Sequence, residues 1–79
     1  NILMAEDLAL KTLSVRIRDE RKSQGLTQTE LANLADVSLN FVSQLESAKS
    51  TVQMDKVLQV LKTLGLELNI RYGKKGISS

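Results

Sequence analysis

The chain has 79 residues, 42% of them hydrophobic and 25% charged, a balance that suits one small globular domain and excludes a disordered or fibrous protein. It contains no cysteine and no histidine, which excludes disulfides, thiolate nucleophiles, and thiolate or imidazole metal sites, and its formal net charge is +2. With no apolar run near the roughly 20 residues of a membrane span and no signal segment, the sequence predicts a cytoplasmic protein without a catalytic residue, cofactor or metal.

The first element is a helix over about residues 8–24. Leu10, Leu13 and Ile17 recur at helical spacing, and Gly25 follows where a left-handed helix stop is expected. Residues 1–4 are given no role.

A second helix is expected over about residues 28–35. Thr27 precedes Glu30 by three residues, which is the spacing of a capping box, in which each side chain bonds the backbone N–H of the other residue. Leu31, Leu34 and Ala35 supply its expected apolar face.

A third helix, over about residues 39–47, follows the short Asp36-Val37 connection, and Ser38 is its expected N-cap. Its apolar side carries Phe41, Val42 and Leu45. The opposite side is uncharged and holds amides and hydroxyls at i, i+3, i+4 and i+7, namely Asn40, Ser43, Gln44 and Ser47. A face that served only solubility would normally carry lysine or glutamate.

The last helix is expected over about residues 54–64, ending at Gly65. Its predicted buried residues are Met54, Val57, Leu58, Leu61 and Leu64.

The period then changes to two. Leu66, Leu68, Ile70 and Tyr72 alternate with polar residues, which is typical of a half-buried strand over about residues 66–72. The chain offers no second strand, so we expect this one to pair with its copy about a two-fold axis, which makes these four residues a dimer interface.

Residues 28–47 have the outline of a helix-turn-helix, because two short helices are joined by a tight turn and the second is polar on one side. Ala32 and Ala35 are small enough for a close helix crossing, and Val42 and Leu45 anchor the second helix.

At these positions the chain resembles the Xre family, the helix-turn-helix group that includes the phage Cro and repressor proteins. The resemblance covers about residues 13–64 and rests on "GLTQTELA" (25–32), "VSLNFVSQLE" (37–46) and Lys49. The stretch "TVQMDKVLQVLKTLGLEL" (51–68) is more particularly similar to HipB-type antitoxin regulators, which implies a DNA-binding dimer that also binds a HipA-like kinase toxin.

The family resemblance implies roles for several residues. Thr27 and Gln28 would meet a DNA phosphate, as would Lys49. Arg21 and Glu46 would form a partly buried structural ion pair. The residues implied to face the major groove, together with their N-cap, are Ser38, Leu39, Asn40, Ser43 and Gln44.

Two residues depart from the family pattern. In that pattern, glycine usually follows each of the two helices of the motif. Asp36 and Ala48 stand there instead. A left-handed alanine costs about 1–2 kcal/mol, so we expect the loop after the third helix to take another path.

Plainer interpretations stand beside these roles. Asn40 and Gln44 alone would more often be solvated, and Leu39 is equally an edge-of-core residue. The basic residues Arg16, Arg18 and Lys22 are interpreted as a solvated helix face.

The predicted fold is therefore an all-α, lambda-repressor-like helix-turn-helix domain spanning residues 1–79, with a C-terminal β-strand pairing across a dimer. The predicted function is an autoregulatory repressor that binds a palindromic double-stranded operator as a homodimer and acts as a HipB-like antitoxin. The alternative is a toxin-neutralising module in which DNA binding is secondary.

Overall fold

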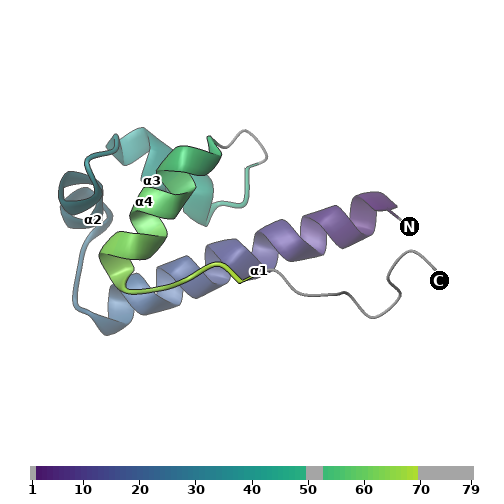
Figure 1. Ribbon diagram of the computed structural model, residues 1–79, viewed down its shortest axis with the longest axis horizontal. Helices are drawn as coiled ribbons and strands as arrows, with labels where there is room; N and C mark the ends of the chain where they lie inside the picture. Colours follow the sequence, from purple (N-terminus) through teal and green to yellow (C-terminus); the bar gives the residue numbers. More distant parts are fainter. Residues whose placement is uncertain (1, 50–52, 70–79) are drawn as a thin grey trace.

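A computed structural model describes residues 2–49 and 53–69, with side chains from residue 8 onward. The helices in this part of the chain are α1 (Ile2–Ser23), α2 (Gln28–Ala35), α3 (Leu39–Glu46) and α4 (Met54–Leu64). Figure 1 shows α2, α3 and α4 gathered on the C-terminal half of α1, while the N-terminal half of α1 extends past them. The helices α2 and α4 have the predicted bounds, α1 begins earlier than predicted, and α3 ends one residue earlier.

Side-chain caps begin the two short helices. The Thr27 Oγ1 atom accepts a hydrogen bond from the Glu30 backbone N–H at 3.0 Å, and the Thr27 N–H donates to Glu30 Oε1 at 2.8 Å. Ser38 Oγ likewise accepts from the Phe41 N–H at 3.0 Å. The predicted capping box and N-cap are confirmed, so α2 and α3 start where their local sequence directs.

All four helices end in the same way. Each helix is followed by a residue with positive φ. The N–H of this residue and the N–H of the next one donate hydrogen bonds to carbonyls of the last helical turn, which is the Schellman arrangement. The left-handed residues are Gly25, Asp36, Ala48 and Gly65. Two of them are the glycines at which the sequence predicts helix stops.

Ala48 corrects one expectation. The sequence predicts that the loop after α3 avoids a left-handed alanine, yet Ala48 has a φ of 61°. Its N–H donates to the Leu45 carbonyl at 3.2 Å, and the Lys49 N–H donates to the Gln44 carbonyl at 3.1 Å. These bonds satisfy carbonyls at the end of α3 and offset the steric cost of the alanine Cβ.

We expect Ala48→Gly to raise the free energy of unfolding by about 1 kcal/mol, because glycine adopts a positive φ without that cost. Urea unfolding of the variant and its parent measures the change. Ala9→Gly, on the exposed helical surface of α1, is the control and should destabilise by a similar amount. An Ala48→Gly variant no more stable than its parent would contradict this account of the loop.

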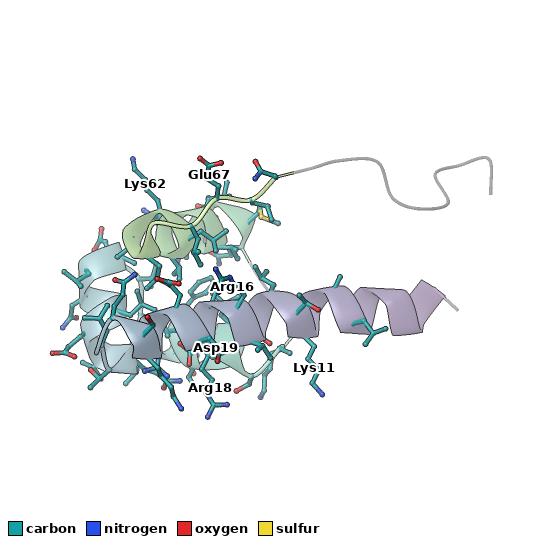
Figure 2. The ribbon with its side chains drawn as sticks, turned by 90° about the horizontal axis from the view of Figure 1, so that it is seen from below. Lys11, Arg16, Arg18, Asp19, Lys62 and Glu67 are labelled. Carbon is teal, nitrogen blue, oxygen red and sulfur yellow. The ribbon has the colours of Figure 1, made fainter. Side chains whose placement is uncertain are left out.

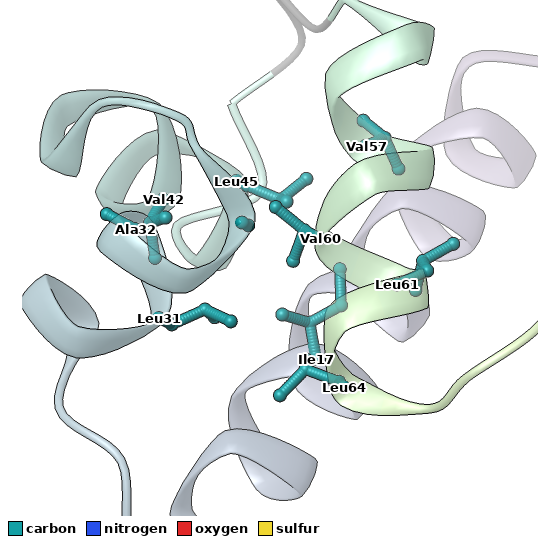
Figure 3. Close-up of a cluster of buried hydrophobic side chains, with 10 residues drawn as sticks. Ile17, Leu31, Ala32, Val42, Leu45, Val57, Val60, Leu61 and Leu64 are labelled. Carbon is teal, nitrogen blue, oxygen red and sulfur yellow. The ribbon is translucent and has the colours of Figure 1, made fainter.

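The core lies where the four helices meet. Ile17 of α1 lies among apolar side chains of the other three helices, and Figure 3 shows this cluster. The remaining buried members are Leu31, Ala32 and Ala35 from α2, Val42 and Leu45 from α3, and Val57, Val60, Leu61 and Leu64 from α4. Helix α2 packs on α3 and α4, and helix α3 packs on α2 and α1. Helices α1 and α4 therefore support the helix-turn-helix.

Two leucines and one methionine that were predicted to be buried are exposed. Leu34 is 63% exposed, Met54 53% and Leu58 47%, whereas Ala32 and Val60 are buried. The buried stripe of each helix is therefore rotated from the predicted one. Helical periodicity allows several adjacent stripes, and contact with the neighbouring helices selects one of them.

The segment after α4 leaves the core gradually. Leu66 packs against the core and Leu68 is about half exposed, and no strand is assigned to residues 66–69. Residues 70–72, which complete the predicted strand with Ile70 and Tyr72, lie outside the described residues. In the described ranges no helix has the length and apolar character needed to cross a membrane.

Candidate nucleic-acid interface

One side of α3 faces away from the core. Val42 and Leu45 are fully buried and hold the helix against its neighbours, which turns the opposite side outward. Leu39 and Asn40 are exposed there, and Ser43 and Gln44 are half-buried. Of the residues predicted to contact DNA, none is buried, so this face is open to a ligand.

The polar groups of this face are available. Among the described residues, no hydrogen-bond partner is found for the side chains of Asn40, Ser43 and Gln44. The hydroxyls of Thr27 and Ser38, in contrast, accept bonds as helix caps. An unpaired amide can bond bidentately to adenine in the major groove, and an aliphatic side chain such as Leu39 can contact a thymine methyl.

Arg21 and Glu46, for which the sequence predicts an ion pair, lie together and join α1 to the end of α3. Arg21 Nε lies 2.7 Å from Glu46 Oε2, and Nη2 donates to Oε1 at 3.0 Å. Their side chains are only 9% and 3% exposed. Arg21 Nη1 also donates to the Leu26 carbonyl at 2.8 Å, which ties in the turn before α2.

The pair has an electrostatic consequence for the arginine. The hydrogen bond that Arg21 donates to Glu46, aided by the negative charge of that carboxylate, raises the pKa of Arg21 above the ordinary value even though burial acts in the opposite direction. The guanidinium is therefore charged throughout the range in which proteins are handled.

Gln28 is also part of this network. Its Nε2 atom donates to Glu46 Oε1 at 3.1 Å, so the start of α2 and the end of α3 are joined through one carboxylate. The same Nε2 carries a second N–H, which is the group available for the phosphate contact predicted from the sequence. This bond spans 18 residues and has no local sequence signal.

Lys49 lies just beyond α3, and its side chain is exposed. The backbone bond to Gln44 described above fixes the position of its Cα relative to the α3 face. Gln28, which bonds Glu46, and Lys49 thus both lie near the C-terminal end of α3, beside the reading helix, as phosphate contacts would.

Gln24 has a structural role that sequence reasoning missed. Its Nε2 donates to the Leu64 carbonyl at 2.9 Å and to Glu20 Oε2 at 3.0 Å, so the ends of α1 and α4 are linked.

Within the part of the chain that the structure describes, no three histidine, cysteine, aspartate or glutamate residues gather as a metal site would require.

Comparison with known proteins identifies this arrangement. Residues 17–70 match the sequence profile of a family described as helix-turn-helix, of the Xre and lambda-repressor type. The chain belongs to this helix-turn-helix family. The matched region contains α2, α3 and α4 together with the C-terminal part of α1 that supports them.

A curated relative agrees with this family assignment. The chain is 52% identical over 54 residues to the "uncharacterized HTH-type transcriptional regulator y4mF" of Sinorhizobium fredii (strain NBRC 101917 / NGR234). The alignment covers 68% of this helix-turn-helix chain and 71% of the relative.

Proposed function

We propose that this helix-turn-helix protein is a sequence-specific transcriptional regulator, an autoregulatory repressor that binds a palindromic operator as a homodimer. The observation that carries the proposal is the outward side of α3, whose amide and hydroxyl groups are exposed or half-buried and are left without partners among the described residues. The name of the relative supports the same function. We propose no enzymatic activity.

The proposed mechanism divides the contacts into two kinds. Phosphate contacts by Thr27, Gln28 and Lys49 set the position of the domain on the duplex without reading sequence. Asn40, Ser43, Gln44 and Leu39 then meet base edges in the major groove. Because the Arg21–Glu46 pair fixes α3 relative to α1 and α2, the reading groups reach the groove in one orientation.

A homodimer would place two such helices on one operator. Met54, Leu58 and Leu68 are each about half exposed, and they are the apolar residues of α4 and the following segment that a second copy could cover. Pairing of the predicted strand over residues 66–72 would add backbone hydrogen bonds. Two-fold symmetry would then set the α3 helices about 34 Å apart, in successive major grooves, and require a palindromic site.

Selection of bound duplexes from a random pool tests the function directly. We expect an enriched palindrome whose half-sites are about one helical turn apart. Enrichment of no sequence would contradict specific readout.

Truncation of the α3 amides tests the reading face. We expect Gln44→Ala and Asn40→Ala each to weaken binding to the selected operator by about 1–3 kcal/mol and to relax preference at defined bases. Gln59→Ala, which removes an exposed amide from α4, is the control and should bind as the parent does. Fluorescence anisotropy with operator and mismatched duplexes measures both quantities, and unchanged affinity in both α3 variants would reject this face.

Sedimentation tests the dimer. We expect the parent to be a dimer at tens of micromolar and Leu68→Asp to dissociate it, because a charge would enter the apolar contact. Leu34→Asp replaces another exposed leucine, on α2, and should remain dimeric. A monomeric parent would remove both the dimer and the palindromic operator.

A second candidate function is toxin neutralisation as a HipB-like antitoxin. The similarity of residues 51–68 to such regulators favours it, and so does a separate apolar surface on the outer side of α1, where Leu8 and Val15 are exposed. That surface is distinct from α3, so a HipA-like kinase toxin bound there would leave the base-reading face uncovered. Co-purification of a kinase-like protein with the tagged chain would support this function, and a failed operator selection with a captured toxin would make it the primary one.

A further inference from the structure

A row of basic side chains follows α1. Lys11, Arg18 and Lys22 stand at i, i+7 and i+11, so they fall within about 40° of one another around the helix axis. Figure 2 shows Lys11 and Arg18 pointing to the same side of α1, away from the side on which Lys62 and Glu67 lie. The sequence alone gave no reason to separate these residues from the rest of a solvated helix surface.

Two members of the row open onto a polar hollow of about 340 Å³. The hollow lies where the C-terminal half of α1 meets the start of α2 and the end of α3. The residues that line it are Arg18, Arg21, Lys22, Gln28, Glu46 and Ser47. It therefore adjoins the candidate interface, since Gln28 begins α2 and Ser47 directly follows α3.

The charge in the hollow is not balanced. Glu46 is the single carboxylate among its lining residues, and it is already paired with Arg21 through two hydrogen bonds. Arg18 and Lys22 are both exposed, and no ion pair joins either of them to another described residue. The lining thus carries two unneutralised positive charges, together with the second N–H of Gln28, and this set of donors is complementary to an anion.

We infer that Arg18 and Lys22 bind a backbone phosphate of the same duplex whose bases α3 contacts. The inference rests on the proposed function and extends it from the helix-turn-helix to α1. A DNA phosphate suits the hollow better than a free anion because the duplex would be held beside it by α3. Lys11 lies about 10 Å farther along α1 and reaches toward the following phosphates of that strand.

Salt dependence of DNA binding tests the inference, since each lost phosphate contact lowers the slope of log K against log salt concentration by about 0.9. The Arg18→Ala/Lys22→Ala variant should lower the slope by about 0.9 per bound protomer, because the two side chains share one phosphate. It should weaken binding to the selected operator and to a random duplex by the same factor, because phosphates carry no sequence information.

The control is Arg16→Ala/Lys62→Ala, which removes the same net charge. Figure 2 shows Arg16 and Lys62 directed away from the side of Arg18. This control should keep the slope of the parent, and thermal melting of both variants verifies that they fold. All four residues are exposed, so both variants are expected to melt within a few degrees of the parent.

The outcomes separate the two proposals. If the parent binds DNA and the Arg18/Lys22 variant has the same slope as the control, the inference is overturned and the proposed function stands. Equal losses of slope in the two variants would also overturn it, because the effect would then be that of net charge. A parent that binds no duplex would contradict the proposed function and this phosphate contact together.

Discussion

Replacing Arg21 with alanine is expected to lower the free energy of unfolding by about 3–5 kcal/mol, because the change leaves the Glu46 carboxylate charged, buried and without its partner. It also removes the bond to the Leu26 carbonyl, so the turn before α2 is released at the same time. A loss of this size is a large fraction of the stability of a small domain. Chemical denaturation of the two proteins under identical conditions gives the difference.

Arg18→Ala is the matched control for this experiment. It removes an arginine from the same helix, three residues earlier, but from an exposed position, so its effect on unfolding should stay within about 0.5 kcal/mol. If Arg21→Ala melted within a degree or two of the parent, the pair would contribute nothing to the position of α3. Restoration of stability by a second change, Glu46→Leu, would identify the stranded carboxylate as the source of the loss.

Replacing Leu45 with alanine is expected to destabilise the protein by about 2–5 kcal/mol. Leu45 is one of the two fully buried residues of α3, so its truncation leaves a cavity behind the reading helix. DNA affinity should fall with it, because a helix that is poorly anchored must be ordered when it binds. Thermal unfolding and operator binding, measured on one preparation, report the two effects.

Leu39→Ala separates packing from reading on the same helix. Leu39 is 47% exposed at the start of α3, so its truncation should change stability by well under 1 kcal/mol while weakening operator binding. Stability losses of equal size in Leu39→Ala and Leu45→Ala would show that Leu39 belongs to the core edge. A stable Leu45→Ala variant would mean that Leu45 does not anchor α3 in the core.

The local sequence determined where α2 and α3 begin and where α1 and α4 end. Thr27 with Glu30, and Ser38 alone, are caps whose partners lie three residues away, and Gly25 and Gly65 end helices through their own backbone freedom. Such interactions involve only neighbouring residues, so they can be identified without knowledge of the fold. The uncharged side of α3 was also visible in the sequence, because charge and helical spacing are local properties.

The dimer prediction also rests on a local pattern, but the strand that it requires is not assigned among the described residues. The alternation of residues 66–72 indicates a strand, but a strand is formed only when a second one supplies its hydrogen bonds. Residues 66–69 are described without such a partner and are assigned no strand. The pairing across a dimer therefore stays a prediction that the sedimentation experiment addresses.

Tertiary packing alone decided which apolar residues are buried and which polar residues meet. Leu34 and Ala32 both fit an amphipathic α2, and only the position of α3 and α4 selected Ala32 for the core. Ala48 keeps a left-handed conformation because the capping hydrogen bonds at the end of α3 offset the steric cost of its Cβ. The residue type alone indicates only that cost. Gln28 and Glu46 are 18 residues apart, and the hollow beside Arg18 and Lys22 collects groups from three helices. No periodicity encodes such contacts, because they exist only after the helices have packed and their distances have been fixed by the core.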